Sequence, residues 1–170
     1  TSLAIRTTLG VLPANEADGV IEAYASLEGL RALDAVPGVW SVRPIIGPIP
    51  LSVTSEATGS SVHNSTNWND YGFTGLGVKV GIIDSFDGYT ELIGLELPAP
   101  AGVRCYTAVG TSSSNFADCQ SEDSNHGTAV AEAVVDIAPG VELYLADVPT
   151  CGLDLIETAL WMVSEGVQVI

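Results

Sequence analysis

The sequence predicts an α/β fold, in which a doubly wound parallel sheet follows a small α+β unit. From residue 75 onward, short apolar runs alternate with segments whose apolar residues recur every three to four positions. Parallel strands need helical crossovers, so this alternation is typical of a sheet with helices on both faces. Hydrophobic residues make up 46% of the 170 residues and charged ones only 15%, which is enough apolar material for a packed core.

Residues 1–50 form the predicted α+β unit. Residues 3–9 fit a strand, and one amphipathic helix fits 16–33, where the apolar residues are Val20, Ile21, Tyr24, Leu27, Leu30 and Leu33. A Pro-Gly pair then breaks the pattern before a short strand at 39–42. The prolines that follow indicate an extended connector, so we expect a domain boundary near residues 44–54.

Residues 51–74 are a predicted linker with a short helix over 62–71, and residues 75–170 are the main domain. Residues 78–83 form a nearly continuous apolar run, which is typical of a strand buried on both faces of a parallel sheet. A long irregular stretch is expected over 94–124.

The second half of the main domain continues the alternation. A helix over 129–137, stopped by a Pro-Gly pair, precedes a strand over 141–146. Asp154, with Glu157 three residues later, predicts a capping box that opens a further helix. The expected buried side of that helix carries Leu155, Ile156, Ala159, Leu160 and Val163. The strand over 167–170 is cut by the end of the sequence, so we expect the chain to be a piece of a longer polypeptide.

The chain is strongly acidic. Five Lys and Arg residues oppose 21 Asp and Glu residues, which gives a net charge of −16. Nucleic acids and anionic membrane surfaces attract clustered positive charge, so we expect neither as a partner. No apolar run reaches the roughly 18 residues that a membrane-spanning helix needs.

The three cysteines are unevenly spaced. Cys105 and Cys119 bracket a polar stretch, and a disulfide between them would stabilise the fold by about 3 kcal/mol. Such a bond predicts a secreted protein, whereas the alternative is two free thiols. Cys151 is left over, and its partner, if it has one, lies outside this chain.

Two residues carry the candidate chemistry. Asp84 follows the predicted strand at 78–83, at the carboxyl end where the catalytic groups of open α/β sheets collect. His126 stands where a polar loop enters the next predicted helix. Each alone has a simple explanation, a turn or cap residue for the carboxylate and a surface position for the imidazole. Together they predict a general base, because a carboxylate can orient an imidazole and stabilise its protonated form.

Four segments follow one another between residues 75 and 170. They are GLGVKVGIIDS at 75–85, HGTAVA at 126–131, APGVEL at 138–143 and GVQVI at 166–170. This series resembles the subtilases, the subtilisin-like serine peptidases. The first segment is similar to the aspartate segment of that family, the second to its histidine segment, and the last two to the strands that follow.

The resemblance implies a subtilisin-like domain, of which this chain holds the first half. It also implies a Ser-His-Asp triad, in which Asp84 orients His126 and His126 deprotonates a serine. The family's oxyanion-hole asparagine and its Gly-Thr-Ser nucleophile segment are then expected beyond Ile170. Phe86 stands where the family usually has glycine, so we keep Asp87 as a reserve candidate for the carboxylate.

The resemblance suggests roles for other parts of the chain. Residues 1–50 resemble a subtilase propeptide, which would assist folding and inhibit the enzyme, in trans as well; an accessory subdomain is the alternative. Gly152 would let a substrate backbone approach as an added strand, and a plain loop is the alternative. No cofactor is required and no metal ligand set is assigned. Calcium would be a structural ion at Asp118, Glu122 and Asp123, unless these form a solvated acidic loop.

These expectations make the chain part of a secreted serine endopeptidase that hydrolyses peptide bonds through an acyl-enzyme. Its partners would be a protein or peptide substrate and the remaining C-terminal part of the domain, since the chain alone lacks the nucleophile. The alternative is a non-catalytic extracellular structural or assembly module, in which Asp84 and His126 are relics. A Gly-Thr-Ser segment downstream, or on a second chain, would discriminate between the two.

Overall fold

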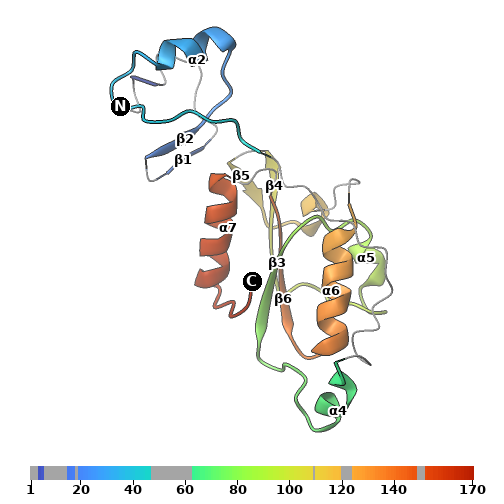
Figure 1. The fold of residues 1–170 in the computed structure, drawn as a ribbon. Coiled ribbons are helices and arrows are strands. Elements are labelled where there is room, and N and C mark those ends of the chain that lie inside the picture. The colour runs from blue at the N-terminus through green and yellow to red at the C-terminus, as the bar shows by residue number, and fades with distance from the viewer. Residues whose placement is uncertain are drawn as a thin grey trace.

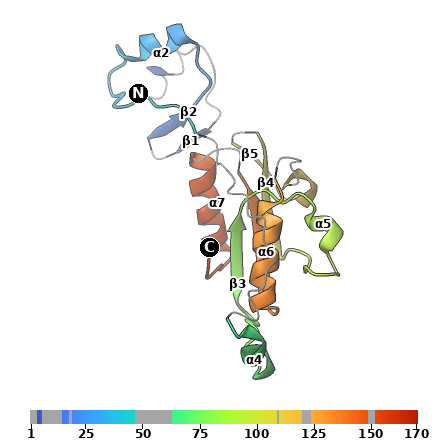
Figure 2. The same cartoon turned by 45° about the vertical axis from the view of Figure 1, so that its right-hand side comes forward.

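The structure is a computed structural model that describes residues 4–5, 15–17, 19–46, 63–108, 110–119, 124–148 and 152–170. Its main body is a mixed α/β unit in which a four-stranded sheet lies between helices (Figure 1). A smaller unit, formed by described residues before residue 47, lies beside the first turn of α7 (Leu153–Ser164) (Figure 1, Figure 2).

The sheet of the main body is mostly parallel. Strands β3 (Lys79–Ile83), β6 (Glu142–Asp147) and β4 (Gly102–Ala108) run parallel in that spatial order. Strand β5 (Thr111–Ser113) pairs antiparallel with β4 at the edge. The predicted α/β class and the two strands predicted within this sheet are confirmed.

The expectation of an irregular stretch over 94–124 is wrong. Strands β4 and β5 and a 3-10 turn, η1 (Phe116–Cys119), lie within it. Neither strand has a clean apolar pattern, since β4 includes Arg104 and β5 consists of Thr and Ser. Pairing with β6, which is distant in the sequence, stabilises β4 as a strand, and local propensity does not reveal it.

Helices cover both faces of the sheet. Helices α5 (Tyr89–Leu92) and α6 (His126–Ile137) lie on one side and α7 lies on the other (Figure 1). The helix predicted over 129–137 is therefore confirmed. The short helix predicted over 62–71 is also present, as α4 (Ser65–Asp70).

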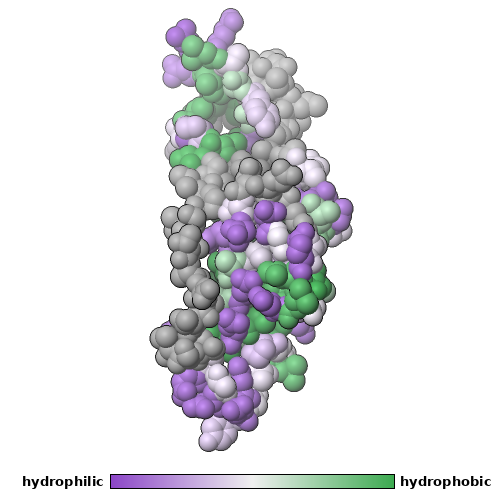
Figure 3. All heavy atoms as spheres, turned by 90° about the vertical axis from the view of Figure 1, so that its right-hand side faces the viewer, coloured by the Kyte–Doolittle hydropathy of each residue, from purple (hydrophilic) through white to green (hydrophobic). Residues whose placement is uncertain are grey.

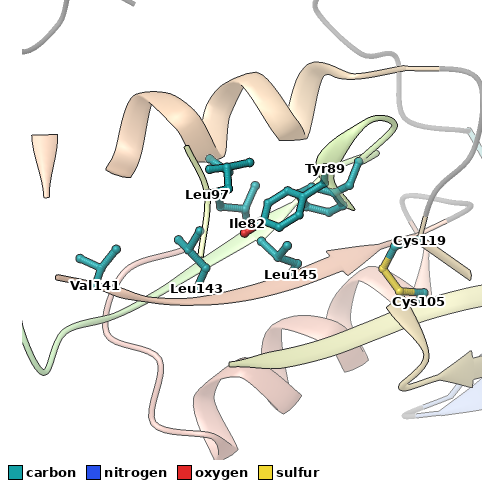
Figure 4. Close-up of a cluster of buried hydrophobic side chains, with 10 residues drawn as sticks. Ile82, Tyr89, Leu97, Cys105, Cys119, Val141, Leu143 and Leu145 are labelled. Atoms are coloured by element: carbon teal, nitrogen blue, oxygen red, sulfur yellow. A yellow bond between two sulfur atoms is a disulfide. The ribbon is translucent and has the colours of Figure 1, made fainter. Parts of the chain in front are cut away.

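The hydrophobic core lies between the sheet and α6. Ile82, Leu143 and Leu145 point toward that helix, and Tyr89 reaches into the same cluster (Figure 4). On the opposite face of β6, the ring of Tyr144 packs against Trp161 of α7 with 6.1 Å between centroids. Strand β6 is thus buried on both faces. In β3, for which the apolar run predicted such burial, Gly81 and Ile82 are buried and the other residues are half-buried.

The predicted burial of α7 is wrong for three of its five apolar residues, whereas Leu155 and Ala159 are half-buried. Ile156, Leu160 and Val163 are 53%, 62% and 64% exposed, and the buried residues are Leu153, Asp154, Thr158 and Met162. Two of these are polar, and both have hydrogen bonds: the Thr158 hydroxyl donates to the Tyr106 hydroxyl at 3.3 Å, and Asp154 Oδ1 accepts from the Gly110 N–H at 3.0 Å. Tertiary partners therefore select the buried face of α7, not the strongest apolar stripe.

The predicted capping box of α7 is also wrong. Its N-cap is Gly152, which has no side chain to offer, and the Asp154 carboxylate bonds to the β4–β5 turn instead. The cap comes from the N-terminal unit. Glu22, only 5% exposed, accepts a hydrogen bond from the Leu153 N–H at 2.8 Å through Oε1. A carboxylate at this position satisfies an amide that has no partner within the helix.

The N-terminal unit departs from its predicted single helix. Strands β1 (Asn15–Ala17) and β2 (Val20–Glu22) form an antiparallel hairpin, and only then does α2 (Leu27–Leu33) begin. Gly19, at φ +81°, turns the chain between the strands. Ser26 begins α2 because its hydroxyl accepts from the Gly29 N–H at 3.1 Å.

Two predicted strands of this unit are not found. Residues 39–42 are irregular, with Trp40 97% exposed, because no described strand pairs with them. Ala4 and Ile5 are helical, and the rest of the strand predicted over 3–9 lies outside the described residues. The domain boundary expected near 44–54 falls mostly outside them as well.

The last residues of the chain lie beside β3. Gly166, at φ +77°, ends α7, and the strand predicted over 167–170 contributes one parallel bridge, between Val169 and Val80. The Lys79 ammonium donates to the Glu165 carbonyl at 2.7 Å. A cation at this place stabilises the C-terminal end of α7.

The surface shows polar and apolar areas side by side. Figure 3 views the face that carries α5 and α6, where hydrophilic side chains border a hydrophobic area. Ile93 and Leu95, which follow α5, and Ile137, which ends α6, are exposed. Among the helices of the described ranges, none combines the length and hydropathy needed to cross a bilayer.

A first prediction concerns the contact between the two units. We expect Glu22→Ala to destabilise the first turn of α7 by about 1.5–3 kcal/mol, because a hydrogen bond to a charged group is lost. Hydrogen exchange of the Leu153 amide should accelerate accordingly. Glu28→Ala, on the exposed part of α2, is the control and should leave that amide unchanged. Equal exchange rates in both variants would contradict a capping role for Glu22.

A second prediction concerns Tyr89, which is fully buried and donates to the Pro98 carbonyl at 2.9 Å. Burial raises the pKa of Tyr89 to about 12, whereas an exposed tyrosine titrates near pH 10. The unfolded chain therefore ionises first. We expect the Tyr89 contribution to stability to be complete below about pH 10 and to be lost as the pH rises to about 12.

Chemical denaturation at a series of alkaline pH values, with phenolate absorbance recorded in parallel, measures this effect. Tyr89→Phe keeps the ring and removes the titrating group. It should show a shallower alkaline loss of stability than the unsubstituted protein, and equally steep losses would exclude Tyr89 as the cause.

Candidate active site

The aspartate of the candidate site continues directly from β3. Asp84 is the residue after Ile83, and its N–H donates to the Ala146 carbonyl of β6 at 2.9 Å. This bond extends the parallel ladder by one residue. The Asp84 side chain is therefore positioned by the sheet itself, at the carboxyl end of its strands.

The histidine of the site opens α6. His126 is the first residue of that helix, and its Nδ1 lies 2.5 Å from Asp84 Oδ2. The two side chains are 20% and 19% exposed, so the pair is sheltered but open on one side. The second carboxylate oxygen, Asp84 Oδ1, accepts from the Ser85 N–H at 2.8 Å. Both oxygens of the carboxylate are therefore held in place.

This geometry specifies the tautomer of a neutral imidazole. An ionised carboxylate only accepts hydrogen bonds, so Nδ1 carries the proton that Asp84 accepts. The lone pair of the neutral His126 ring then lies on Nε2. A nitrogen of this kind can accept a proton from a hydroxyl and later return it to a leaving group, while the carboxylate stabilises the imidazolium formed in between. The pair can therefore act as a general base and acid, and it needs a separate nucleophile.

Three hydrogen bonds tie the segment after Asp84 to the beginning of α6. The Gly127 N–H donates to the Ser85 carbonyl at 2.9 Å, and the Asp87 N–H donates to the Ser124 carbonyl at 3.1 Å. The Thr128 hydroxyl donates to the Asp87 carbonyl at 2.8 Å. These bonds are local to the pair and keep the two segments in register.

Gly127 allows the two segments to approach this closely. A Cβ atom there would lie 2.7 Å from both Asp84 Cβ and the Ser85 carbonyl oxygen, and 2.8 Å from Phe86 Cε1. Two of these three contacts are with backbone or with the first atom of a side chain, which cannot rotate away. A glycine after His126 is thus a packing requirement of the site.

Among the predicted site residues, Asp84 and His126 come together and Asp87 does not join them. Asp87 is exposed and contributes only its backbone groups and no carboxylate contact to His126. Gly152 lies at the N-cap of α7, partly buried. It lines a cavity of about 840 Å³ between α7 and the N-terminal unit, with Glu22 and Leu153 among its neighbours.

The predicted disulfide between Cys105 and Cys119 is confirmed, and both cysteines are fully buried (Figure 4). Of the three acidic residues considered for calcium, Asp118 is exposed, and Glu122 and Asp123 lie outside the described residues. Within the described ranges, no group of three or more His, Cys, Asp or Glu side chains could hold a metal ion. Cys151 also lies outside them.

Four residues that support the pair were not predicted as site residues. Ser85, Ser124 and Thr128 act through backbone or hydroxyl groups, and Phe86 is a fully buried side chain beside Gly127. Thr128 belongs to the HGTAVA segment, and its place two residues after His126 could have indicated a supporting role. Ser124 carries no such pattern, because its role depends on where the chain returns from β5.

No family model matches the sequence, and no curated protein matches it. The chemistry of this site is therefore inferred from its own geometry. The deciding features are the short Nδ1···Oδ2 contact and the close approach at Gly127.

A third prediction tests that close approach. We expect Gly127→Ala to destabilise the protein by about 1–3 kcal/mol through overpacking, although alanine is the better helix former. The Gly127→Ala substitution should also move the His126 side chain away from Asp84. The tautomer of His126, read from ¹⁵N NMR, and thermal unfolding measure the two effects.

Gly81→Ala is the matched control for this variant. Its new methyl group would meet the flexible end of Met162, 2.5 Å from Sδ, on the α7 side of β3. It should lower stability without changing the His126 tautomer. A Gly127→Ala variant with unchanged stability and an unchanged tautomer would show that the approach is not a constraint.

Proposed function

We propose that this chain is the N-terminal part of a secreted serine endopeptidase of the subtilase type. The observation that carries the proposal is the 2.5 Å contact between His126 Nδ1 and Asp84 Oδ2 at the carboxyl end of a mostly parallel sheet. The nucleophilic serine would come from residues beyond Ile170 or from a second chain.

The proposed reaction is peptide-bond hydrolysis in two steps. His126 Nε2 takes the proton of the serine hydroxyl while the serine oxygen attacks the scissile carbonyl carbon. Asp84 accepts the Nδ1–H throughout and stabilises the imidazolium. The proton then passes to the amide nitrogen as the C–N bond breaks, leaving an acyl-enzyme. Water, deprotonated by the same nitrogen, then attacks the ester carbonyl. The ester C–O bond breaks, the acyl group leaves as a carboxylic acid, and the proton on Nε2 returns to the serine oxygen.

The departure at Phe86 is compatible with this proposal. Its side chain is fully buried, so it occupies the core and leaves Asp84 unobstructed. Gly88, at φ +75°, takes the left-handed backbone conformation that the next turn needs. The sharp turn thus occurs later in the chain, where a glycine is available.

The N-terminal unit is propeptide-like in this proposal. It contacts the main body at the first turn of α7 through Glu22 and Leu153. Gly152, the residue proposed to let a substrate backbone approach as an added strand, borders the same contact. A buried disulfide suits an oxidising, extracellular setting.

The decisive experiment is the intact mass of the purified protein, with and without a fluorophosphonate that labels activated serines. We expect a longer or second chain that contains a serine nucleophile to gain the mass of the probe. A species of 17.6 kDa alone, with no label on any associated chain, would favour the non-catalytic extracellular module instead.

A fourth prediction uses the two histidines of the chain. In the complete protein, His126→Ala should lower kcat by about a thousandfold or more and leave the melting temperature nearly unchanged. His63→Ala is the matched control, because His63 is exposed and should affect neither quantity. A large loss of stability in His126→Ala would make His126 a structural residue.

A further inference from the structure

Phe86 has an unusual position for a large apolar side chain, two residues after the candidate aspartate. It is fully buried, and its ring lies 6.1 Å from Tyr89 and 6.3 Å from Phe116, centroid to centroid. Tyr89 and Phe116 are also in contact, at 5.1 Å. We call these three residues the aromatic cluster. Its burial anchors the backbone directly after Asp84.

The aromatic cluster also supports the beginning of α6. Phe86 Cε1 would lie 2.8 Å from a Cβ atom at residue 127, so its ring lies directly against Gly127. His126 precedes that glycine in the same helical turn. A change in the position of the Phe86 ring would therefore shift His126 and Asp84 relative to each other, because the ring contacts both segments.

The disulfide belongs to the same buried cluster as the aromatic cluster. The Phe86 N–H donates to the Cys119 carbonyl at 3.4 Å, and Cys119 closes η1 next to Phe116. Cys105 belongs to β4 and lies opposite Asp147 of β6 in the sheet register. The hydrogen bond joins the segment after Asp84 to η1, and the disulfide joins η1 to β4. The segment is thus linked back to the sheet from which Asp84 extends.

We propose that the Cys105–Cys119 disulfide and Phe86 are positioning elements for the Asp84–His126 pair. Without either element, the segment at residues 84–87 loses its support behind Gly127, and the bond between Nδ1 and Oδ2 is no longer held. A dithiol that reduces the disulfide is oxidised to its own disulfide, transfers two electrons and two protons, and leaves two thiols on the protein. Reduction of the disulfide therefore removes one of the two supports of the pair. The importance of this for catalysis rests on the proposed function, whereas the positioning itself does not.

The test measures the pair directly, in the full 170-residue chain, below the unfolding temperature of each variant. ¹⁵N-histidine NMR reports the tautomer of His126, and the far-downfield proton resonance reports the Nδ1–H bond. Asp84→Asn provides the reference for a broken pair, and His63→Ala assigns the signals. We expect the unsubstituted chain to show the Nδ1–H tautomer and Asp84→Asn to lose it. The absence of that difference would overturn the proposal.

Two variants probe the two positioning elements separately. Cys105→Ala with Cys119→Ala removes the bond, and Phe86→Leu keeps the bond and removes the ring. Both should give the His126 signals of Asp84→Asn while the rest of the chain stays folded. Should the double cysteine variant not fold, Phe86→Leu decides alone. Met162→Ala is the matched control, because Met162 is fully buried on the α7 face and should destabilise the fold without changing the tautomer.

Chemical reduction of the unsubstituted chain completes the test. Treatment with a dithiol should produce the His126 signals of the double cysteine variant, and removal of the dithiol in air should restore the original ones. Folded variants and a reduced chain that all keep the Nδ1–H tautomer would overturn the proposal.

Kinetics in the complete enzyme separate the two proposals. If the chain belongs to a serine peptidase, Phe86→Leu should lower kcat by about a hundredfold with KM unchanged, the size of loss expected when a catalytic group is misplaced by about 1 Å. If the variants lose the Nδ1–H tautomer but no serine takes up the fluorophosphonate, the peptidase function is rejected and the positioning role stands. If a serine takes up the label but the variants keep the Nδ1–H tautomer, the positioning role is rejected and the peptidase function stands.

Discussion

The candidate site depends on one steric constraint, the close approach between the end of β3 and the first turn of α6. Gly127 makes it possible, because any larger residue would meet Asp84, the Ser85 carbonyl and Phe86 at once. The hydrogen bonds between the two segments form because the backbones lie this close together. The 2.5 Å contact between Asp84 and His126 is thus a result of backbone packing.

The support for this approach comes from both faces of the site. On the sheet side, the Asp84 N–H continues the parallel ladder to Ala146. Phe86 and the two cysteines of the disulfide belong to the buried core cluster next to the pair. A site that needs a sub-ångström geometry is therefore built on a strand end and a helix start, which are more rigid than a loop.

The candidate pair could be predicted from the sequence because each member stands at the end of a strong local pattern. Asp84 ends a continuous apolar run, and His126 precedes a regular helical stripe. The supporting residues could not be predicted in the same way. Phe86 gave only a sign of departure from a family pattern, and the hydrogen bonds of Ser124 depend on a chain reversal between β4 and β5 that has no clean pattern of its own.

The order of β3, α6, β6 and α7 could be predicted from the sequence, since apolar periodicity and Pro-Gly stops are local properties of the chain. The hairpin before α2 was hidden because the apolar residues of β2 and α2 happen to share a helical spacing. The buried face of α7, in contrast, is selected by contacts between distant segments. Thr158 and Asp154 are buried beside partners that are distant in the sequence: Tyr106 of β4 is 52 residues from Thr158, and Gly110 is 44 residues from Asp154. No local pattern records a hydrogen bond between segments so far apart.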